Sequence, residues 1–187
     1  MPNSILIELT RHYLEPHRRY HNLAHIAHML QGALQAAESM GQKLTDEQIF
    51  AIWFHDAIYD PRASDNEEKS AELAVKLLTA EGWPRERIET VRKIVLDTKH
   101  HEPHLEPSKA VIDADLQTLA LPWEGYNKIG QLIRQEYTHV SDADWKKGRS
   151  GFFQVWLDRK QIYYTPWGAK LEKQARENLA RTIAGEV

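Results

Sequence analysis

Apolar residues recur along most of this chain at intervals of three and four positions, which is the spacing of one face of an α-helix. No segment shows the strict alternation of a half-buried strand. The pattern predicts an all-α fold, with helices over about 4–14, 20–40, 46–59, 64–80, 84–99, 110–116, 124–138, 142–163 and 168–184.

Several residues mark where these helices begin and end. Thr45 is a predicted N-cap, and Gly41 and Gly82 are predicted stops. Ser64 followed three residues later by Glu67 has the pattern of a capping box. The helix at 46–59 is apolar on every side, so we expect it at the centre of a bundle.

Composition narrows the class of protein. The 187 residues are enough for one domain with a real core, and we treat 1–187 as that single domain. A net charge of −3 gives no evidence for nucleic acid binding, and the absence of cysteine excludes disulfides and thiolate metal sites. No apolar run is long enough to span a bilayer, and the N-terminus lacks the pattern of a signal peptide. We therefore expect a cytoplasmic protein.

The most informative feature is His55-Asp56, which interrupts an otherwise apolar run at 49–59. Buried polar side chains must be paired or must coordinate something. A metal ion satisfies a neutral imidazole and an ionised carboxylate together. The alternative is a hydrogen-bonded pair inside the core.

Two other apolar segments carry similar residues. His25 lies among Leu23, Ala24, Ile26 and Ala27, and it shares a predicted helix face with His21 and His28. Asp113 and Asp115 lie in the apolar segment 110–116, where one of them could instead cap a helix. Histidine, His-Asp and Asp on three separate helices could converge on one metal ion.

This order of residues resembles the HD superfamily of metal-dependent phosphohydrolases, whose pattern is H…HD…D on a helical bundle. The likeness is most detailed to a small bacterial branch of predicted HD-type phosphohydrolases and covers about residues 19–179. The segments that carry it are Arg19–His25, Phe54–Pro61, Asp65–Ala71, Thr98–His101, Asp113–Leu116, Ile133–Tyr137 and Glu172 with Ala175–Leu179.

The resemblance implies an HD-type bundle, with its core at about 19–120 and further helices at about 124–184. It implies that His25, His55, Asp56 and Asp115 are the metal ligands, with Asp56 also acting in catalysis. Asp115 is preferred because the last Asp of the family commonly follows an alanine; Asp113 would then be a supporting residue or a cap. Glu67 matches a carboxylate that serves near the metal in relatives, where it could orient the attacking water.

Two imidazoles and two carboxylates suit Mn, Fe, Co, Ni or Zn better than Mg, which prefers oxygen ligands alone. A phosphorylated substrate also needs cationic or hydrogen-bonding partners. Candidates are Arg19, which is predicted on the same helix as His25, together with Arg18, Lys99, Arg134 and Arg149. His101 is a candidate for a phosphate contact or for a second metal.

We therefore expect a metal-dependent phosphohydrolase that acts on a small phosphate ester, such as a nucleotide, through a metal-activated water. One alternative is an HD-fold di-iron oxygenase, for which His100, His101 and His104 could supply extra ligands. Others are a metal- or nucleotide-binding regulatory module without turnover, and a purely structural bundle. Trp123, Trp145 and Trp167 could line a pocket or the face of a homodimer, although core positions are more common for tryptophan.

Overall fold

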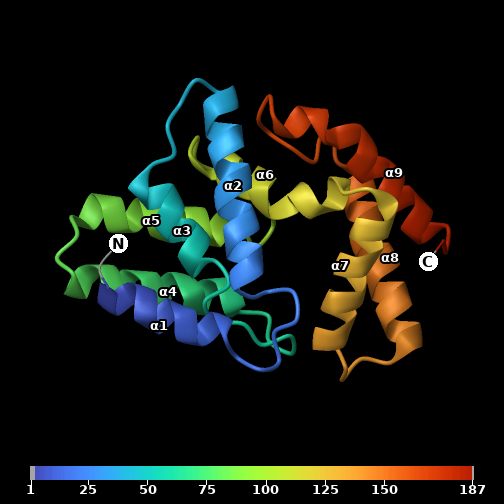
Figure 1. The fold of residues 1–187 in the computed structure, drawn as a ribbon, viewed down its shortest axis with the longest axis horizontal. Helices are drawn as coiled ribbons and strands as arrows, with labels where there is room; N and C mark the ends of the chain where they lie inside the picture. The colour runs from blue at the N-terminus through green and yellow to red at the C-terminus, as the bar shows by residue number, and fades with distance from the viewer. Residues whose placement is uncertain (1–2, 187) are drawn as a thin grey trace.

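A computed structural model describes residues 3–186, and these residues form an all-α fold without strands (Figure 1). The α-helices and two short 3₁₀ helices follow one another as α1 Asn3–Tyr13, α2 Leu23–Ser39, α3 Asp46–Phe54, α4 Asn66–Ala80, α5 Arg85–Asp97, α6 Ser108–Leu116, η1 Gln117–Ala120, α7 Trp123–Glu136, α8 Asp142–Asp158, η2 Gly168–Lys170 and α9 Glu172–Ile183.

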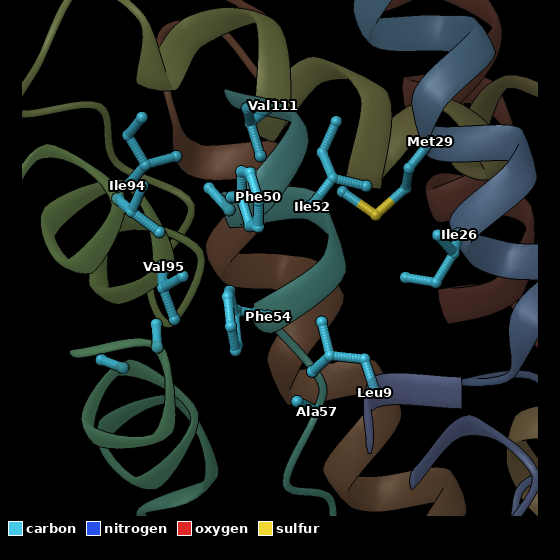
Figure 2. Packing of buried hydrophobic residues seen from close by; sticks show 14 of the residues in the cluster. Leu9, Ile26, Met29, Phe50, Ile52, Phe54, Ala57, Ile94, Val95 and Val111 are labelled. Atoms are coloured by element: carbon cyan, nitrogen blue, oxygen red, sulfur yellow. The ribbon is translucent and has the colours of Figure 1, made fainter. Parts of the chain in front are cut away.

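The first core is built around α3, which packs against α2, α4, α5 and α6. Phe50 and Phe54 lie on the side of Ile94 and Val95, while Ile52 lies on the side of Met29 (Figure 2). The expected central place of this apolar helix is therefore confirmed. Its burial fixes the position of the polar residues that follow Phe54.

A second core joins α7, α8 and α9 to the end of α6 and to η1. Trp156 and Ile162 are among its fully buried side chains. In Figure 1 the helix α6 runs from the first core toward the second, behind α2. Ile112 and Leu116 belong to the second core, whereas Val111 and Ala114 of the same helix belong to the first. The helix α6 is thus shared by both cores.

Several predicted boundaries are confirmed. The Thr45 side chain accepts a hydrogen bond from the N–H of Gln48, whose own side chain accepts one from the N–H of Thr45. Gly41 and Gly82 have φ values of +71° and +74°, which explains why glycine ends these helices.

Other boundaries were predicted wrongly. The helix expected at 46–59 ends at Phe54, and the helix expected at 20–40 begins only at Leu23. The predicted capping box at Ser64 and Glu67 does not form, because Asp65 is the N-cap and makes no side-chain capping bond. The helix expected at 142–163 ends at Asp158. Among residues 3–186, no helix has the length and apolarity needed to cross a membrane.

Candidate metal centre

His55 and Asp56 lie where α3 ends, with His55 as the C-cap residue. Arg18, whose side chain is fully buried, donates hydrogen bonds to the carbonyl oxygens of Asp56 at 2.7 Å and Ala57 at 2.9 Å. It also donates to the carbonyl of His21 at 3.1 Å. Since these carbonyls have a side-chain donor, the chain can leave the helix without burying unpaired backbone groups. Arg18 was a candidate for phosphate binding, but its role here is structural.

Four side chains from α2, from α6 and from the turn after α3 meet at one point. His25 lies in the first turn of α2, and its Nε2 is 3.2 Å from Nε2 of His55 and 3.2 Å from Oδ1 of Asp115 on α6. Oδ2 of Asp56 lies 2.9 Å from Nε2 of His55 and 3.8 Å from Nε2 of His25. The predicted convergence of these residues is therefore present in the fold.

The spacing of these atoms fits a metal ion. Ligand bonds of about 2.0–2.2 Å place neighbouring ligand atoms about 2.8–3.6 Å apart and opposite ones about 4.2 Å apart. The ligand atoms of His25, His55 and Asp56 all lie within 4.8 Å of one another, so these three residues could hold an ion. Asp115 adds Oδ1, which lies 3.2 Å from Nε2 of His25 and 3.9 Å from Nε2 of His55.

The centre is buried on the imidazole side and partly exposed on the carboxylate side. Both histidine side chains are 2% exposed, whereas those of Asp56 and Asp115 are 16% and 15% exposed. Solvent can therefore reach the carboxylates, while the two imidazoles are buried in the core.

The hydrogen bonds of His55 fix which nitrogen faces the centre. Its Nδ1 lies 2.8 Å from the carbonyl oxygen of Ile52, and because a carbonyl only accepts, Nδ1 carries the proton. Nε2 is then the nitrogen available to a metal, as in histidine sites whose other nitrogen is bound to a supporting acceptor.

Electrostatics also favours a cation here. Burial lowers the pKa of His55, but the charge and hydrogen bond of Asp56 outweigh it and raise this pKa to about 9. Burial raises the pKa of Asp56, yet the charge of His55 more than offsets it, so the pKa lies well below its usual range. The two carboxylates stay ionised, and the proton they hold on His55 occupies a place that a metal ion could take instead.

Asp113, the alternative ligand, points away from this cluster. Its Oδ1 accepts from the N–H of Tyr164 at 2.8 Å, and its Oδ2 accepts from the N–H and hydroxyl of Thr165 at 2.8 and 2.6 Å. Burial raises its pKa to about 6, although these bonds oppose the rise. Asp113 thus fastens the 163–165 segment to α6, and Asp115 is the carboxylate that reaches the imidazoles.

His101 approaches the centre from the other side of Asp115. Its Nε2 is 3.1 Å from Oδ2 of Asp115, the oxygen that does not face His25. Its φ of +51° is uncommon for a residue with a side chain. Its carbonyl accepts hydrogen bonds from Tyr164 and Arg159, which hold this conformation. Of the three histidines considered for extra ligands, His100 is exposed and His104 binds Asp97, so His101 alone contacts the centre.

Glu136 was not among the predicted site residues, but it organises the loop beside the centre. Its Oε1 accepts from the backbone N–H groups of Arg19, Tyr20 and His21, at 2.6, 2.7 and 3.1 Å. Its Oε2 binds Nδ1 of His21 at 2.6 Å and the hydroxyl of Tyr59 at 2.9 Å. His21 packs edge-on against the ring of His25, with 5.9 Å between their centroids. A carboxylate far along the chain therefore positions an imidazole next to a candidate ligand.

The remaining predicted site residues do not contact the four side chains of the centre. Arg19 lies in the turn before α2, not on the same helix as His25, and its exposed side chain forms no ion pair within residues 3–186. Lys99 pairs with Glu68 and with the carbonyl of Ser64. Arg134 binds Asp142 and two carbonyls at the turn between α7 and α8. Glu67 is half-buried in the first turn of α4, and no hydrogen bond joins it to the centre in the described part of the chain.

No protein-family model matches this chain, and comparisons with curated proteins and with solved structures find no match either. The resemblance to HD-type proteins therefore stays a prediction. Support for a function comes from the geometry of the residues.

Proposed function

We propose that this protein is a divalent-metal-dependent phosphohydrolase that cleaves a small phosphate ester with an activated water. The observation that carries the proposal is the meeting of His25, His55, Asp56 and Asp115 at a centre whose carboxylates are partly exposed to solvent. The H…HD…D order of these residues agrees with the resemblance described above.

Each residue has a distinct task in this proposal. His25 and His55 would bind the ion through Nε2, and Asp56 and Asp115 through one carboxylate oxygen each. The mixed nitrogen and oxygen set favours Mn, Fe, Co, Ni or Zn over Mg. A bound divalent ion would supply a nucleophilic water near neutral pH and would offset charge on the phosphoryl oxygens.

The groups around the centre would bind and orient the substrate. His101, whose Nε2 contacts Oδ2 of Asp115, would donate a hydrogen bond to a phosphoryl oxygen through its other ring nitrogen. His21, oriented by Glu136 and packed beside His25, would contact an oxygen of the ester. Arg19 lies in the same turn as His21, with a side chain that is free to reach a phosphate within the described structure. Asp56 keeps Nε2 of His55 directed to the ion, and Glu67 remains the candidate for orienting water.

The test is a metal and activity analysis of the purified chain. We expect about one divalent ion per chain by elemental analysis, and release of phosphate from a panel of phosphomonoesters, phosphodiesters and nucleotides with Mn²⁺ or Co²⁺. His55→Ala and Asp56→Ala should abolish both metal content and activity, while Glu124→Gln on the exposed face of α7 should change neither.

Other outcomes would refute the proposal or favour a different function. No bound metal and no hydrolysis with any metal would refute the proposal. Two irons per chain without phosphate release would instead favour a di-iron oxygenase, for which the sharing of Asp115 between His25 and His101 is the supporting observation. A nucleotide that copurifies unhydrolysed would favour a regulatory module.

A further inference from the structure

A cavity of about 450 Å³ lies between α7, α8 and η1, which are drawn at the right of Figure 1. Its size is typical of small-molecule sites. None of the four side chains of the metal centre lines it, so it is a separate site. Much of its wall is apolar and includes Ile129 and Ile133 of α7 and Trp145 and Phe153 of α8. The cavity therefore suits the apolar part of an organic molecule.

Two neighbouring stripes of α8 form one side of the cavity and its mouth. Arg149 and Phe153, four residues apart, are partly and fully buried. Asp144, Gly148 and Phe152 form the next stripe, and all three are exposed. A Cβ added at Gly148 meets no atom within 4 Å, so the middle of this stripe is open. A small molecule can therefore enter the cavity from solvent on this side.

Arg149 is the cationic residue among the described residues that line the cavity, and its guanidinium is packed on three sides. It lies over the rings of Tyr126 and Phe153, 5.6 and 5.1 Å from their centroids. It also rests against Gly130 of α7, where an added Cβ would come within 2.6 Å of Nη2 of Arg149. Glycine disfavours a helix interior, and here it leaves the space that the guanidinium fills.

The guanidinium of Arg149 has no anionic partner in the described part of the chain. Its head carries five N–H groups, yet it forms no ion pair and donates no hydrogen bond within residues 3–186. The carboxylate of Asp144, which also lines the cavity, instead accepts from the hydroxyl of Ser141 at the start of α8. A partly buried charge without a partner costs free energy, which an anion in the cavity would recover.

The charges of the wall favour a ligand with a single negative charge. One guanidinium neutralises one charge, and the carboxylate of Asp144 at the mouth repels a second one. A carboxylate group also matches the planar fork of Arg149, because the two can form a pair of parallel hydrogen bonds. Two hydroxyl groups of the wall, those of Tyr126 and Thr118, already bond to Thr182 and Tyr20.

We propose that this cavity binds an apolar monocarboxylate, whose carboxylate pairs with Arg149 and whose apolar body fills the space between α7 and α8. The apolar wall supplies affinity by removing the body of the ligand from water, and Arg149 selects the head group. This site is independent of the metal centre and of the proposed hydrolysis.

The helix α8 offers variants with matched controls. Arg149→Met removes the charge and keeps an apolar stem, whereas Lys147→Gln removes the same charge from an exposed position outside the cavity. Gly148→Leu adds a side chain at the mouth, whereas Gly151→Leu adds one at an exposed position that does not line the cavity. Neither glycine has a positive φ, so leucine fits the backbone at both.

Calorimetry measures binding of octanoate and 1-naphthylacetate, each beside its neutral amide, to protein freed of metal with EDTA. Without metal, no probe can bind through an ion at the metal centre. We expect wild type, Lys147→Gln and Gly151→Leu to bind the acids at least about tenfold more tightly than the amides, since only the acids form a charged pair. Arg149→Met should bind acid and amide about equally. Gly148→Leu should bind the acids about tenfold more weakly than Gly151→Leu does.

Thermal unfolding checks that each variant folds, and the comparison of acid with amide on wild type stands without the variants. Equal binding of acid and amide by wild type, no binding of either acid, or an unchanged preference in Arg149→Met overturns the inference. Tighter binding of octyl phosphate than of octanoate at about pH 8, where the phosphate is a dianion, also overturns it. So does a dimer in size-exclusion chromatography that binds no probe, because a second copy of the chain then covers the cavity.

Discussion

Replacing Glu136 with glutamine tests whether one buried carboxylate holds the loop beside the metal centre. The side chain of Glu136 is fully buried, and its oxygens serve three backbone N–H groups, His21 and Tyr59. In Glu136→Gln the amide keeps one acceptor oxygen but turns an N–H₂ group toward the donors of His21 and Tyr59. At least one of these bonds must then be lost.

The pKa of Glu136 sets the expected size of the effect. Burial raises this pKa, but the hydrogen bond and charge of His21 and the backbone N–H groups outweigh burial and lower it to about 2. Relative to an ordinary glutamate, a pKa lowered this far corresponds to about 3 kcal/mol of folding free energy. For a chain of this length we expect Glu136→Gln to lower Tm by roughly 6–12 °C near pH 6.

The effect should depend on pH in a definite direction. Because the folded-state pKa of Glu136 is lowered, its stabilisation is complete above about pH 4.5 and is lost as the pH falls toward 2. The pKa of His21 is raised, since the Glu136 bond and nearby carboxylates outweigh burial. The stabilisation that comes from the pairing of Glu136 with protonated His21 is therefore present below about pH 6.5. It is lost as the pH rises through the raised pKa of His21.

Urea unfolding of wild type, Glu136→Gln and the control Glu124→Gln from pH 3.5 to 9 measures these changes. The difference in unfolding free energy between wild type and Glu136→Gln should be largest near pH 5–6 and should shrink toward pH 3.5. Glu124, exposed on the same helix, should show a difference of at most a few tenths of a kcal/mol. A Glu136→Gln variant within about 0.5 kcal/mol of wild type at pH 6 would refute the reasoning.

Three further predictions follow from other residues. Asp115→Asn should weaken Mn²⁺ binding about tenfold or more in calorimetry, whereas Asp113→Asn should leave it unchanged and lower stability by about 1–3 kcal/mol; the opposite pattern would exchange their roles. Arg18→Met should cost about 3–5 kcal/mol in urea unfolding, because three carbonyls lose their donor; a smaller loss than 1 kcal/mol would contradict this. The bond to Asp97 raises the pKa of His104, so His104→Gln should reduce stability at pH 5.5 but not at pH 9.

The helical segments and the central place of the apolar helix α3 could be predicted well from the sequence, because both depend on the local periodicity of apolar residues. Helix ends were predicted less well where distant groups decide them. The α3 helix ends at Phe54 because Arg18, which is far away in the sequence, binds the carbonyls of Asp56 and Ala57. The predicted capping box at Ser64 was wrong because a local pattern could not show that the helix begins at Asn66.

The cluster of histidine and aspartate side chains could be predicted because polar residues in apolar segments are rare enough to stand out. The choice of Asp115 over Asp113 could not be made from spacing alone, since both lie on α6 and only the fold shows that the 163–165 segment takes up Asp113. Glu136 follows a polar stretch of α7, so no local signal separated it from surface glutamates. Its role depends on a contact with a loop more than a hundred residues earlier.

The ends of helices give an independent reason for a cation at this centre. Asp56 follows the C-terminus of α3, and Asp115 lies in the last turn of α6. The C-terminal end of a helix carries partial negative charge, so a carboxylate there is disfavoured by about 0.3–1 kcal/mol, and more where water is scarce. Two carboxylates at two such ends, beside buried imidazoles, gather negative charge at one point. A divalent ion removes the repulsion from both, which is why the position of these carboxylates, and not only their identity, supports a metal site.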